Sequence, residues 1–493
     1  MFASVTSVVL VGVEPVPLRV EVHAGGGSKT ILQIVGLPDT AVREAKQRVT
    51  SALIASGLGP PRGYVVVNLS PADVPKAGSA YDLPIALGLL AAFRRITAST
   101  HSVVALGELA LDGTIRSARG GLGAALIARD QAESTLLLPR HSVHEARLVP
   151  GVEPVGVASL AEAVAVLEGD HTPDPVEAPV SARIPPPDFS AIRGQKDVRR
   201  GLEIAAAGGH HVLMSGSPGA GKTLMASCLP GILPELEGEE ALETALAWAA
   251  GGRQRPDPAR PPFRAPHHSA TMAALIGGGS GIPVPGEVTM AHNGVLFLDE
   301  LGEFPPTILD ALRQPLESGA VTVARKGASV RFPARFQLIA ATNPCPCGFY
   351  EDRLVGCECT PAIKARYRRR FSGPLLDRID LRLGVDRVDV EDLDGPPGEP
   401  SASMSARVLA ARKRQADRGS LNASLGRDEL AGLPSASEVS GILRTKSAGA
   451  RLSARGWLRI LRVARTIADL DENDVVVADH VEEALSLRER PDE

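Results

Sequence analysis

One stretch of eight residues near the middle of the chain constrains the fold more than any other. It fits the phosphate-binding pattern G-x-x-x-x-G-K-[ST] at every fixed position. Its residues are Gly216, Ser217, Pro218, Gly219, Ala220, Gly221, Lys222 and Thr223. Residues 211–215 before it suit a buried strand, and residues 224–229 after it suit the start of a helix. This strand, loop and helix predict a P-loop in an α/β fold. A glycine-rich turn that matches by chance is disfavoured, because further parts of such a site follow downstream.

Each part of the P-loop can contribute to holding a nucleotide. Glycines let backbone N–H groups close around phosphate oxygens, and the helix that follows adds the positive end of its dipole. Lys222 can reach the outer phosphates of ATP, and the Thr223 hydroxyl can ligate Mg²⁺. We therefore expect ATP and Mg²⁺ as cofactors.

Two later strands end in polar residues that can complete an ATPase site. Apolar residues 294–298 lead into Asp299 and Glu300, an arrangement known as Walker B. We expect Asp299 to hold Mg²⁺ through water and Glu300 to orient the attacking water, because phosphoryl transfer depends on positioning and charge stabilisation. Residues 336–341 form a second apolar run before Asn343. Asn343 is either a polar sensor that aligns the water or part of an Asn-Pro turn.

Length and composition limit the other possibilities. A chain of 493 residues exceeds what one core usually organises, so we expect two or three domains. A hydrophobic content of 44% excludes general disorder. The net charge of -4 gives no overall attraction to nucleic acid, so any DNA contact must come from local basic patches. No apolar run approaches the roughly 18 residues of a membrane span. We therefore expect a soluble, cytoplasmic protein without a membrane partner.

The pattern along the chain predicts four parts. Residues 1–168 mix strands and helices, and Leu18, Val20 and Val22 alternate with polar residues as a half-buried strand does. Residues 169–187 are proline-rich and predict a semi-rigid linker. Residues 188–385 contain the nucleotide motifs and form the predicted ATPase core. Residues 386–493 are predicted to form a helical lid.

Three motifs in residues 1–168 resemble the proteolytic domain of Lon-type proteases. They are Pro75-Lys76-Ala77-Gly78-Ser79-Ala80, Gly107-Glu108-Leu109 and Gly120-Gly121-Leu122. Ala80 stands where that family has its serine nucleophile, and a small or apolar residue replaces the partner lysine. Because a Ser-Lys pair needs both members, we expect an inactive α/β domain of this fold (ribosomal S5 domain 2-like) that serves assembly or binding. Ser79 is either a shifted nucleophile or the cap of the following helix.

Two arginines resemble residues that act late in AAA+ ATPase sites. Arg378 resembles the arginine finger, and Arg455 the sensor arginine of the lid. A finger acts across a subunit boundary and contributes roughly 10³ to 10⁵ in rate, so this role requires an oligomer. Arg370, at the end of the basic run 366–370, is a rival finger. That run could also be a solvated basic face or contact an acidic partner.

Taken together, several motifs resemble the YifB/ComM family of magnesium-chelatase-like AAA+ ATPases over nearly the whole chain. They are residues 262–269, 277–279, 285–287 and 343–348, together with the Walker B strand. The resemblance implies a Lon-like N-terminal domain, a P-loop AAA+ module and a helical lid. For ComM-type members it implies a homo-oligomer, a hexameric DNA helicase that drives branch migration during integration of taken-up DNA. Single-stranded or branched DNA is then the expected partner.

Two insertions fit a ring that moves along DNA. Residues 264–287 are rich in glycine and proline around short apolar pieces. Residues 320–324 and 328–332 flank Arg325-Lys326-Gly327, which predicts a hairpin with a basic tip. Basic loops that line a pore can grip phosphates without reading sequence. The alternative is a solvated tip. His267 and His268 could contact substrate or a neighbouring subunit, or serve packing.

Four cysteines cluster at Cys345, Cys347, Cys357 and Cys359. Four thiolates in two pairs, with a loop between the pairs, suit a tetrahedral structural zinc. Four reduced thiols or a redox-sensitive cluster remain the equal alternative. Catalytic zinc is disfavoured, because no open-site ligand set is evident.

A second class of function competes with the DNA motor. Motor subunits of metal chelatases and protein-remodelling machines share the AAA+ core, but the Lon-like front domain fits the DNA-motor family better. The chain lacks a D-x-S-x-S metal motif, which excludes the chelatase adaptor subunit. Ala80 disfavours an ATP-dependent protease.

Overall fold

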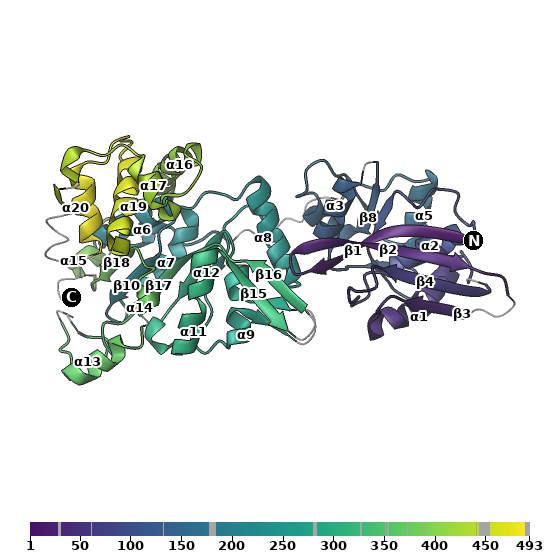
Figure 1. The fold of residues 1–493 in the computed structure, drawn as a ribbon, viewed down its shortest axis with the longest axis horizontal. Coiled ribbons are helices and arrows are strands. Elements are labelled where there is room, and N and C mark those ends of the chain that lie inside the picture. The colour runs from purple at the N-terminus through teal and green to yellow at the C-terminus, as the bar shows by residue number, and fades with distance from the viewer. Residues whose placement is uncertain are drawn as a thin grey trace.

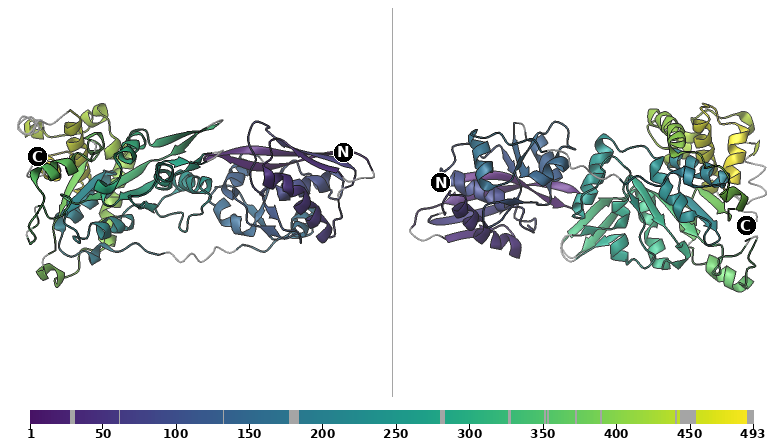
Figure 2. Two further views of the ribbon diagram at one scale, coloured as in Figure 1. Left: turned by 90° about the horizontal axis from the view of Figure 1, so that it is seen from below. Right: turned by 180° about the vertical axis from the view of Figure 1, so that it is seen from behind.

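Two sheets and a group of helices follow one another along the long axis of the molecule (Figures 1 and 2). This computed structural model describes residues 1–27, 31–60, 62–131, 133–176, 184–279, 283–325, 328–350, 352, 354–371, 373–388, 390–439, 441–442 and 454–488. The middle of the predicted linker and the hairpin-tip residues Lys326 and Gly327 lie outside these ranges. No helix of the described part is long and apolar enough to cross a membrane.

A mixed seven-stranded sheet organises the N-terminal region, in the order β3-β4-β2-β1-β5-β8-β9. β2 shows the predicted alternation of apolar and polar residues. Leu18, Val20 and Val22 are buried on one face of the sheet, while Arg19 and His23 are exposed on the other. Its strands are β1 (Phe2–Val11), β2 (Glu14–Ala24), β3 (Ile31–Val35), β4 (Tyr64–Ser70), β5 (Val103–Ala105), β8 (Thr135–Pro139) and β9 (Pro154–Val157), with a separate pair β6 (Glu108–Leu109) and β7 (Ile115–Arg116). The helices are α1 (Thr40–Ala55), α2 (Asp82–Ala92), α3 (Gly121–Asp130), η1 (Arg140–Ser142), α4 (Val143–Ala146) and α5 (Leu160–Glu168).

A five-stranded parallel sheet organises the central region, in the order β11-β14-β17-β10-β18. The strands are β10 (Val212–Gly216), β11 (Phe263–Arg264), β14 (Gly294–Leu298), β17 (Phe336–Thr342) and β18 (Leu381–Val385). Runs such as β14 and β17 are buried at every position, as expected of parallel strands covered on both faces. Because all five strands run the same way, the residues that follow β10, β14 and β17 meet at one edge.

Helices and two hairpins surround this sheet. The helices are η2 (Phe189–Ala191), α6 (Lys196–Gly208), α7 (Lys222–Cys228), η3 (Leu229–Gly231), α8 (Gly238–Ala250), α9 (Met272–Leu275), α10 (Glu287–Met290), η4 (Leu301–Glu303), α11 (Pro306–Ala311), α12 (Arg313–Ser318), α13 (Pro361–Arg368), α14 (Gly373–Leu376) and α15 (Val390–Leu393). The hairpins are β12 (Gly277–Gly278) with β13 (Val284–Pro285), and β15 (Ala320–Arg325) with β16 (Ala328–Pro333). Arg264 and Glu287 close the first predicted insertion with an ion pair at 2.5 Å.

The C-terminal helices gather at the end of the molecule farthest from the N-terminal region (Figure 1). They are α16 (Ser401–Asp417), η5 (Asn422–Ser424), α17 (Arg427–Ala431), α19 (Ala454–Leu470) and α20 (Ala478–Ser486). α16 and α19 pack on α6, and their apolar residues share one buried cluster with β10 and β18. These helices therefore rest on the same sheet that carries the P-loop.

The N-terminal region touches the central region through the tip of the β1–β2 hairpin (Figure 2). Val11 and Val13 pack against the central cluster that contains Val330 and Phe332 of β16. Gly12, between them, has φ +67°, and a side chain there would collide with Val330. A second contact joins α3 to α8, where Ala245 belongs to an N-terminal cluster. The N-terminal region thus contacts β16 of the hairpin with the predicted basic tip.

Candidate nucleotide site and cysteine cluster

The P-loop connects β10 to α7 in the centre of the sheet. Gly219 and Gly221 have φ of +80° and +89°, in the left-handed region that favours glycine. α7 begins at Lys222, directly after the second of these glycines. Of the two fixed glycines of the motif, Gly221 has a conformational cause, whereas Gly216 has a packing cause, because a Cβ there would collide with the carbonyl oxygen of Val385.

Lys222 and Thr223 each contact a residue from another strand. The buried Lys222 ammonium donates to the carbonyls of Gly216 at 2.7 Å and Ser217 at 3.0 Å, and to Asn343 Oδ1 at 3.2 Å. The Thr223 hydroxyl donates to Asp299 Oδ2 at 2.6 Å. Side chains that follow β10, β14 and β17 therefore converge at one edge of the sheet. Burial lowers the pKa of Lys222, and the negative charge of Asp299 opposes this effect.

Glu300 projects beside this group in an unusual backbone conformation. Its φ of +51° is uncommon for a residue with a side chain, and such strain often accompanies function. Its carboxylate, 57% exposed, lies 3.1 Å from His268 Nδ1. The two residues line a cavity of about 340 Å³ together with Thr223, Ser227, Phe263, Ala265, Pro266, His267, Phe297 and Asp299. The sequence left the role of His268 open, and the structure gives it a partner in the site.

Arg378 lies far from the P-loop of its own chain. It precedes β18, whose first residue, Leu381, pairs with Val212 at the start of β10. The P-loop follows the end of β10, so Arg378 lies at the opposite edge of the sheet. Its side chain is 12% exposed and forms an ion pair with Glu317. Desolvation and the charges of nearby arginines, Arg455 among them, lower the pKa of Arg378.

The structure therefore groups the two predicted arginines with each other rather than with their own nucleotide site. Arg455 is exposed at the start of α19. The rival finger, Arg370, instead donates to the carbonyl of Gly302 at 2.9 Å, two residues after Glu300. Arg370 thus lies on the P-loop edge of its own chain. Arg378 and Arg455 instead lie near each other at the opposite edge, from which a subunit could reach a neighbour's site.

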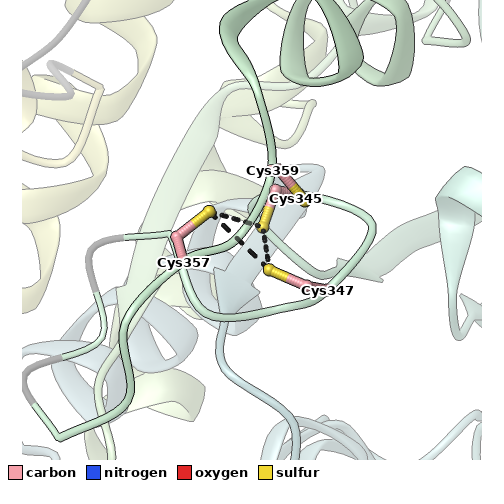
Figure 3. A group of neighbouring side chains, drawn as sticks. All are labelled: Cys345, Cys347, Cys357 and Cys359. Carbon is pink, nitrogen blue, oxygen red and sulfur yellow. Dashed lines mark hydrogen bonds between the residues drawn. The ribbon is translucent and has the colours of Figure 1, made fainter.

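The four cysteines come together in one cluster (Figure 3). Their sulfur atoms all lie within 4.8 Å of one another. The separations are 3.2 Å for Cys345 and Cys347, 3.7 Å for Cys345 and Cys357, and 3.6 Å for Cys347 and Cys357. The backbone N–H of Phe349 is the first cause that lowers the pKa of Cys347, to about 6. Four sulfurs at these distances fit the ligand set of a tetrahedral zinc ion.

The Lon-like motifs of the N-terminal region do not converge in the same way. The buried Lys76 ammonium donates to the carbonyl of Pro71. The Ser79 hydroxyl donates to the Glu108 carboxylate. The prediction that Ser79 caps the next helix is wrong, because α2 begins at Asp82 and its capping residue is Tyr81, without a side-chain cap. The Ser79 hydroxyl instead donates its hydrogen bond to Glu108 of β6.

Comparisons with known proteins bear on the whole of this architecture. Family models described as "Subunit ChlI of Mg-chelatase", "Magnesium chelatase, subunit ChlI" and "Magnesium chelatase, subunit ChlI C-terminal" match residues 20–142, 188–393 and 398–488. The chain is 44% identical over 487 residues to the uncharacterized protein YifB of Escherichia coli, covering 97% of this chain and 95% of YifB. It is 40% identical over 501 residues to the competence protein ComM of Haemophilus influenzae, with the same coverage. The chain belongs to the YifB/ComM family of magnesium-chelatase-like AAA+ ATPases.

Two more distant similarities cover parts of the chain. The chain is 28% identical over 339 residues to the magnesium-chelatase 38 kDa subunit of Rhodobacter capsulatus, covering 62% of this chain and 88% of that subunit. It is 30% identical over 214 residues to Lon protease 2 of Bacillus subtilis, covering 38% of this chain and 36% of the protease. The predicted fold, a P-loop AAA+ module preceded by an α/β domain of Lon-like ancestry, is confirmed.

Sequence patterns did not indicate two residues beside the P-loop, Asp352 and Arg387. Asp352 lies between the two cysteine pairs and Arg387 follows β18. They form an ion pair at 2.9 Å, and Asp352 accepts a hydrogen bond from Ser217 of the P-loop. Neither belongs to a motif, so the only available signal was the position of Asp352 within the cysteine segment.

Proposed function

We propose that the protein is an ATP-hydrolysing AAA+ motor that acts on DNA as a hexameric ring and drives branch migration in recombination of taken-up DNA. One observation carries the ATPase part: Thr223 contacts Asp299 while Lys222 contacts Asn343. These four residues follow three neighbouring strands and meet at one edge, as phosphoryl transfer requires. Such a motor works in the cytoplasm, where its DNA is.

In this proposal each side chain has one task. Thr223 and Asp299 hold Mg²⁺, which neutralises charge on the phosphates when bound, and Lys222 binds the outer phosphates. Glu300 orients the attacking water, and His268 fixes the position of that carboxylate. Asn343 aligns the water. Arg378 and Arg455 complete the site of the neighbouring subunit, so hydrolysis depends on the ring.

The β15–β16 hairpin is the proposed DNA contact. Val323 and Val330 are buried on its inner face, whereas Thr322 and Arg331 are exposed on the other. The hairpin is therefore anchored to the core along one face, and the sequence of its turn includes Arg325 and Lys326. Basic side chains in a pore bind the phosphate backbone without sequence preference.

We also propose that the four cysteines hold one structural zinc ion per subunit. The sulfur separations of 3.2 to 3.7 Å are those of ligands that share one ion. Elemental analysis of protein purified without chelator should give one zinc per subunit. Cys357→Ser should lose it, and protein that never holds zinc contradicts the proposal.

A chelatase-type or protein-remodelling motor that does not act on DNA is the second candidate. The similarity to a magnesium-chelatase subunit favours this candidate, because the match covers 88% of that subunit. The similarity to ComM over nearly the whole chain, N-terminal region included, favours the DNA motor.

A branch-migration assay on a synthetic four-way junction separates these candidates. The DNA motor should convert the junction to duplex products with ATP and Mg²⁺, and Glu300→Gln should not. A double variant, Arg325→Ala with Lys326→Ala, should keep basal ATP hydrolysis but lose branch migration. Arg129→Ala is the matched control, because it removes a partly exposed positive charge elsewhere. Equal branch migration by the double variant would contradict the DNA role of the hairpin, and no conversion by the wild type would favour the second candidate.

A further inference from the structure

The cysteine segment, residues 345–359, begins at the nucleotide site. It starts two residues after Asn343, which contacts Lys222 of the P-loop. Cys345 and Cys347 stand at one end of the segment and Cys357 and Cys359 at the other. Since the four sulfurs form one cluster, a single metal ion would tie both ends of the segment together.

The middle of this segment packs on the P-loop. Gly348 lies so close to Pro218 that a Cβ atom there would be 2.6 Å from Pro218 Cδ, and its φ of +87° also favours glycine. Only a residue without a side chain fits this approach. The backbone after the first cysteine pair therefore rests directly on the P-loop.

Asp352 makes a second, polar contact with the same loop. Its side chain is 2% exposed and accepts hydrogen bonds from the Ser217 hydroxyl and from the backbone N–H groups of Leu354 and Val355, the latter two at 2.9 Å each. These bonds, with the one from Ser217 first, lower the pKa of Asp352 to about 2, so the carboxylate stays charged. It is a fixed charge rather than a mobile surface acid.

Arg387 holds Asp352 in place from the other side. Its Nε atom lies 2.9 Å from Asp352 Oδ2, and its guanidinium lies 5.4 Å from the centre of the Phe349 ring. Arg387 follows β18, the strand next to β10. The cysteine segment is thereby fastened to the P-loop and to the neighbouring strand.

We propose that metal binding at the four cysteines holds Gly348 and Asp352 of the cysteine segment against the P-loop and so raises the affinity of the protein for ATP. This inference rests on the proposed ATPase function and adds its regulation. The contacts of Gly348 with Pro218 and of Asp352 with Ser217 fix the P-loop in one conformation. A loop held in its binding conformation loses less conformational freedom when the nucleotide binds. Without the metal the two ends of the segment are no longer joined to each other, and this support is lost.

Linkage gives the proposal a second, independent consequence. If zinc tightens nucleotide binding by some factor, nucleotide must tighten zinc binding by the same factor. Coupling between sites in proteins is typically about 5- to 150-fold. We expect a factor of roughly fivefold or more in both directions.

The test measures both affinities on the full chain. The dissociation constant of a non-hydrolysable ATP analogue with Mg²⁺ is determined for zinc-loaded and chelator-stripped protein, with circular dichroism to confirm folding. Zinc affinity is measured by competition with a metal indicator, with and without the analogue. Asp352→Asn should still bind zinc, but the ratio of its nucleotide dissociation constants without and with zinc should fall towards one. Asp130→Asn, at an exposed acid of the N-terminal region, is the matched control and should keep the wild-type factor.

The outcomes separate this inference from the proposed function. Equal nucleotide affinity with and without zinc, or an unchanged factor in Asp352→Asn, would overturn it and leave the DNA motor standing. If the stripped protein unfolds, the zinc affinities decide between the outcomes. They are then compared for zinc-loaded wild type and zinc-loaded Asp352→Asn, each with and without the analogue. Linkage without any response to DNA would support the inference and contradict the DNA motor.

Discussion

The N-terminal and central regions carry similar reactive side chains in different arrangements. Lys76 and Ser79 lie three positions apart in the N-terminal region, yet one donates to a backbone carbonyl and the other to Glu108. Lys222 and Thr223 of the central region instead contact Asn343 and Asp299, which are more than 70 positions away in sequence. This difference shows that reactive side chains form a site only where the fold brings them together from distant parts of the chain. Here parallel strands that end at one edge of the sheet bring them together, as in other open α/β sheets.

Loss of a residue in the convergent group should have the largest effect. Glu300→Gln should lower ATP hydrolysis by about 10³-fold, because general-base residues contribute roughly 10² to 10⁴ in rate, while nucleotide binding is retained. Lys222→Ala should abolish hydrolysis by removing the charge that faces the phosphates. Steady-state phosphate release and analogue binding measure the two steps. Hydrolysis by Glu300→Gln at the wild-type rate would remove Glu300 from its assigned role.

A loss smaller than that of Lys222→Ala should come from the opposite edge of the sheet. Arg378→Ala should bind ATP normally but hydrolyse it about 10³-fold more slowly, because the arginine acts on charge that develops only in the transition state. Mixing Arg378→Ala with Lys222→Ala subunits should partly restore hydrolysis, since some interfaces then combine an intact loop with an intact arginine.

Arg370→Ala is the matched comparison for that experiment. Arg370 bonds within its own chain near Glu300, so it should not show restoration by mixing. Proven mixed rings without recovered activity, or full activity of Arg378→Ala, would transfer the finger role away from Arg378.

The contact between the two regions should depend modestly on pH. Burial raises the pKa of Glu145 in α4 to about 7, and its side chain faces Gln254 of the central region. The folded state therefore keeps a proton that the unfolded state releases near pH 4.5, so stability falls as the pH rises from about 4.5 to about 7. Glu145→Gln stays neutral, and its Tm relative to wild type should rise by roughly 2–4 °C between pH 5 and pH 8.

Thermal melts at the two pH values test this directly. Glu153→Gln, at an exposed position of the same region, is the control and should follow the wild type. A Tm difference between Glu145→Gln and wild type that does not change with pH would show that Glu145 does not titrate at the contact.

The smallest effect should come from the Lon-like motif. Ser79→Ala should change ATP hydrolysis and its response to DNA by less than about twofold. Neither the wild type nor this variant should degrade casein. Among the residues that the structure describes, the Ser79 hydroxyl bonds to Glu108 and not to a lysine. Casein cleavage that disappears in Ser79→Ala would show that the N-terminal region carries a working site after all.

Features that depend on residues close together in the sequence could be predicted, whereas contacts between residues far apart in the sequence could not. The P-loop glycines, the buried strand before Asp299 and the family resemblance all rest on local patterns, and the predicted fold is confirmed. The contact of Asp352 with Ser217 joins residues 135 positions apart, and no spacing rule predicts it. The capping alternative for Ser79 failed for the same reason, because Glu108 of β6, 29 positions away, accepts its hydrogen bond. The proximity of Arg378 to Arg455 likewise depends on how α19 packs.

The most direct test of the central claim is the rate of ATP hydrolysis with and without a branched DNA junction, at several salt concentrations. We predict a low basal rate, several-fold stimulation by the junction, loss of that stimulation as salt rises, and hydrolysis by Glu300→Gln that is about 10³-fold slower than by the wild type. Equal rates with and without the junction at every salt concentration would contradict a motor whose nucleotide site responds to DNA.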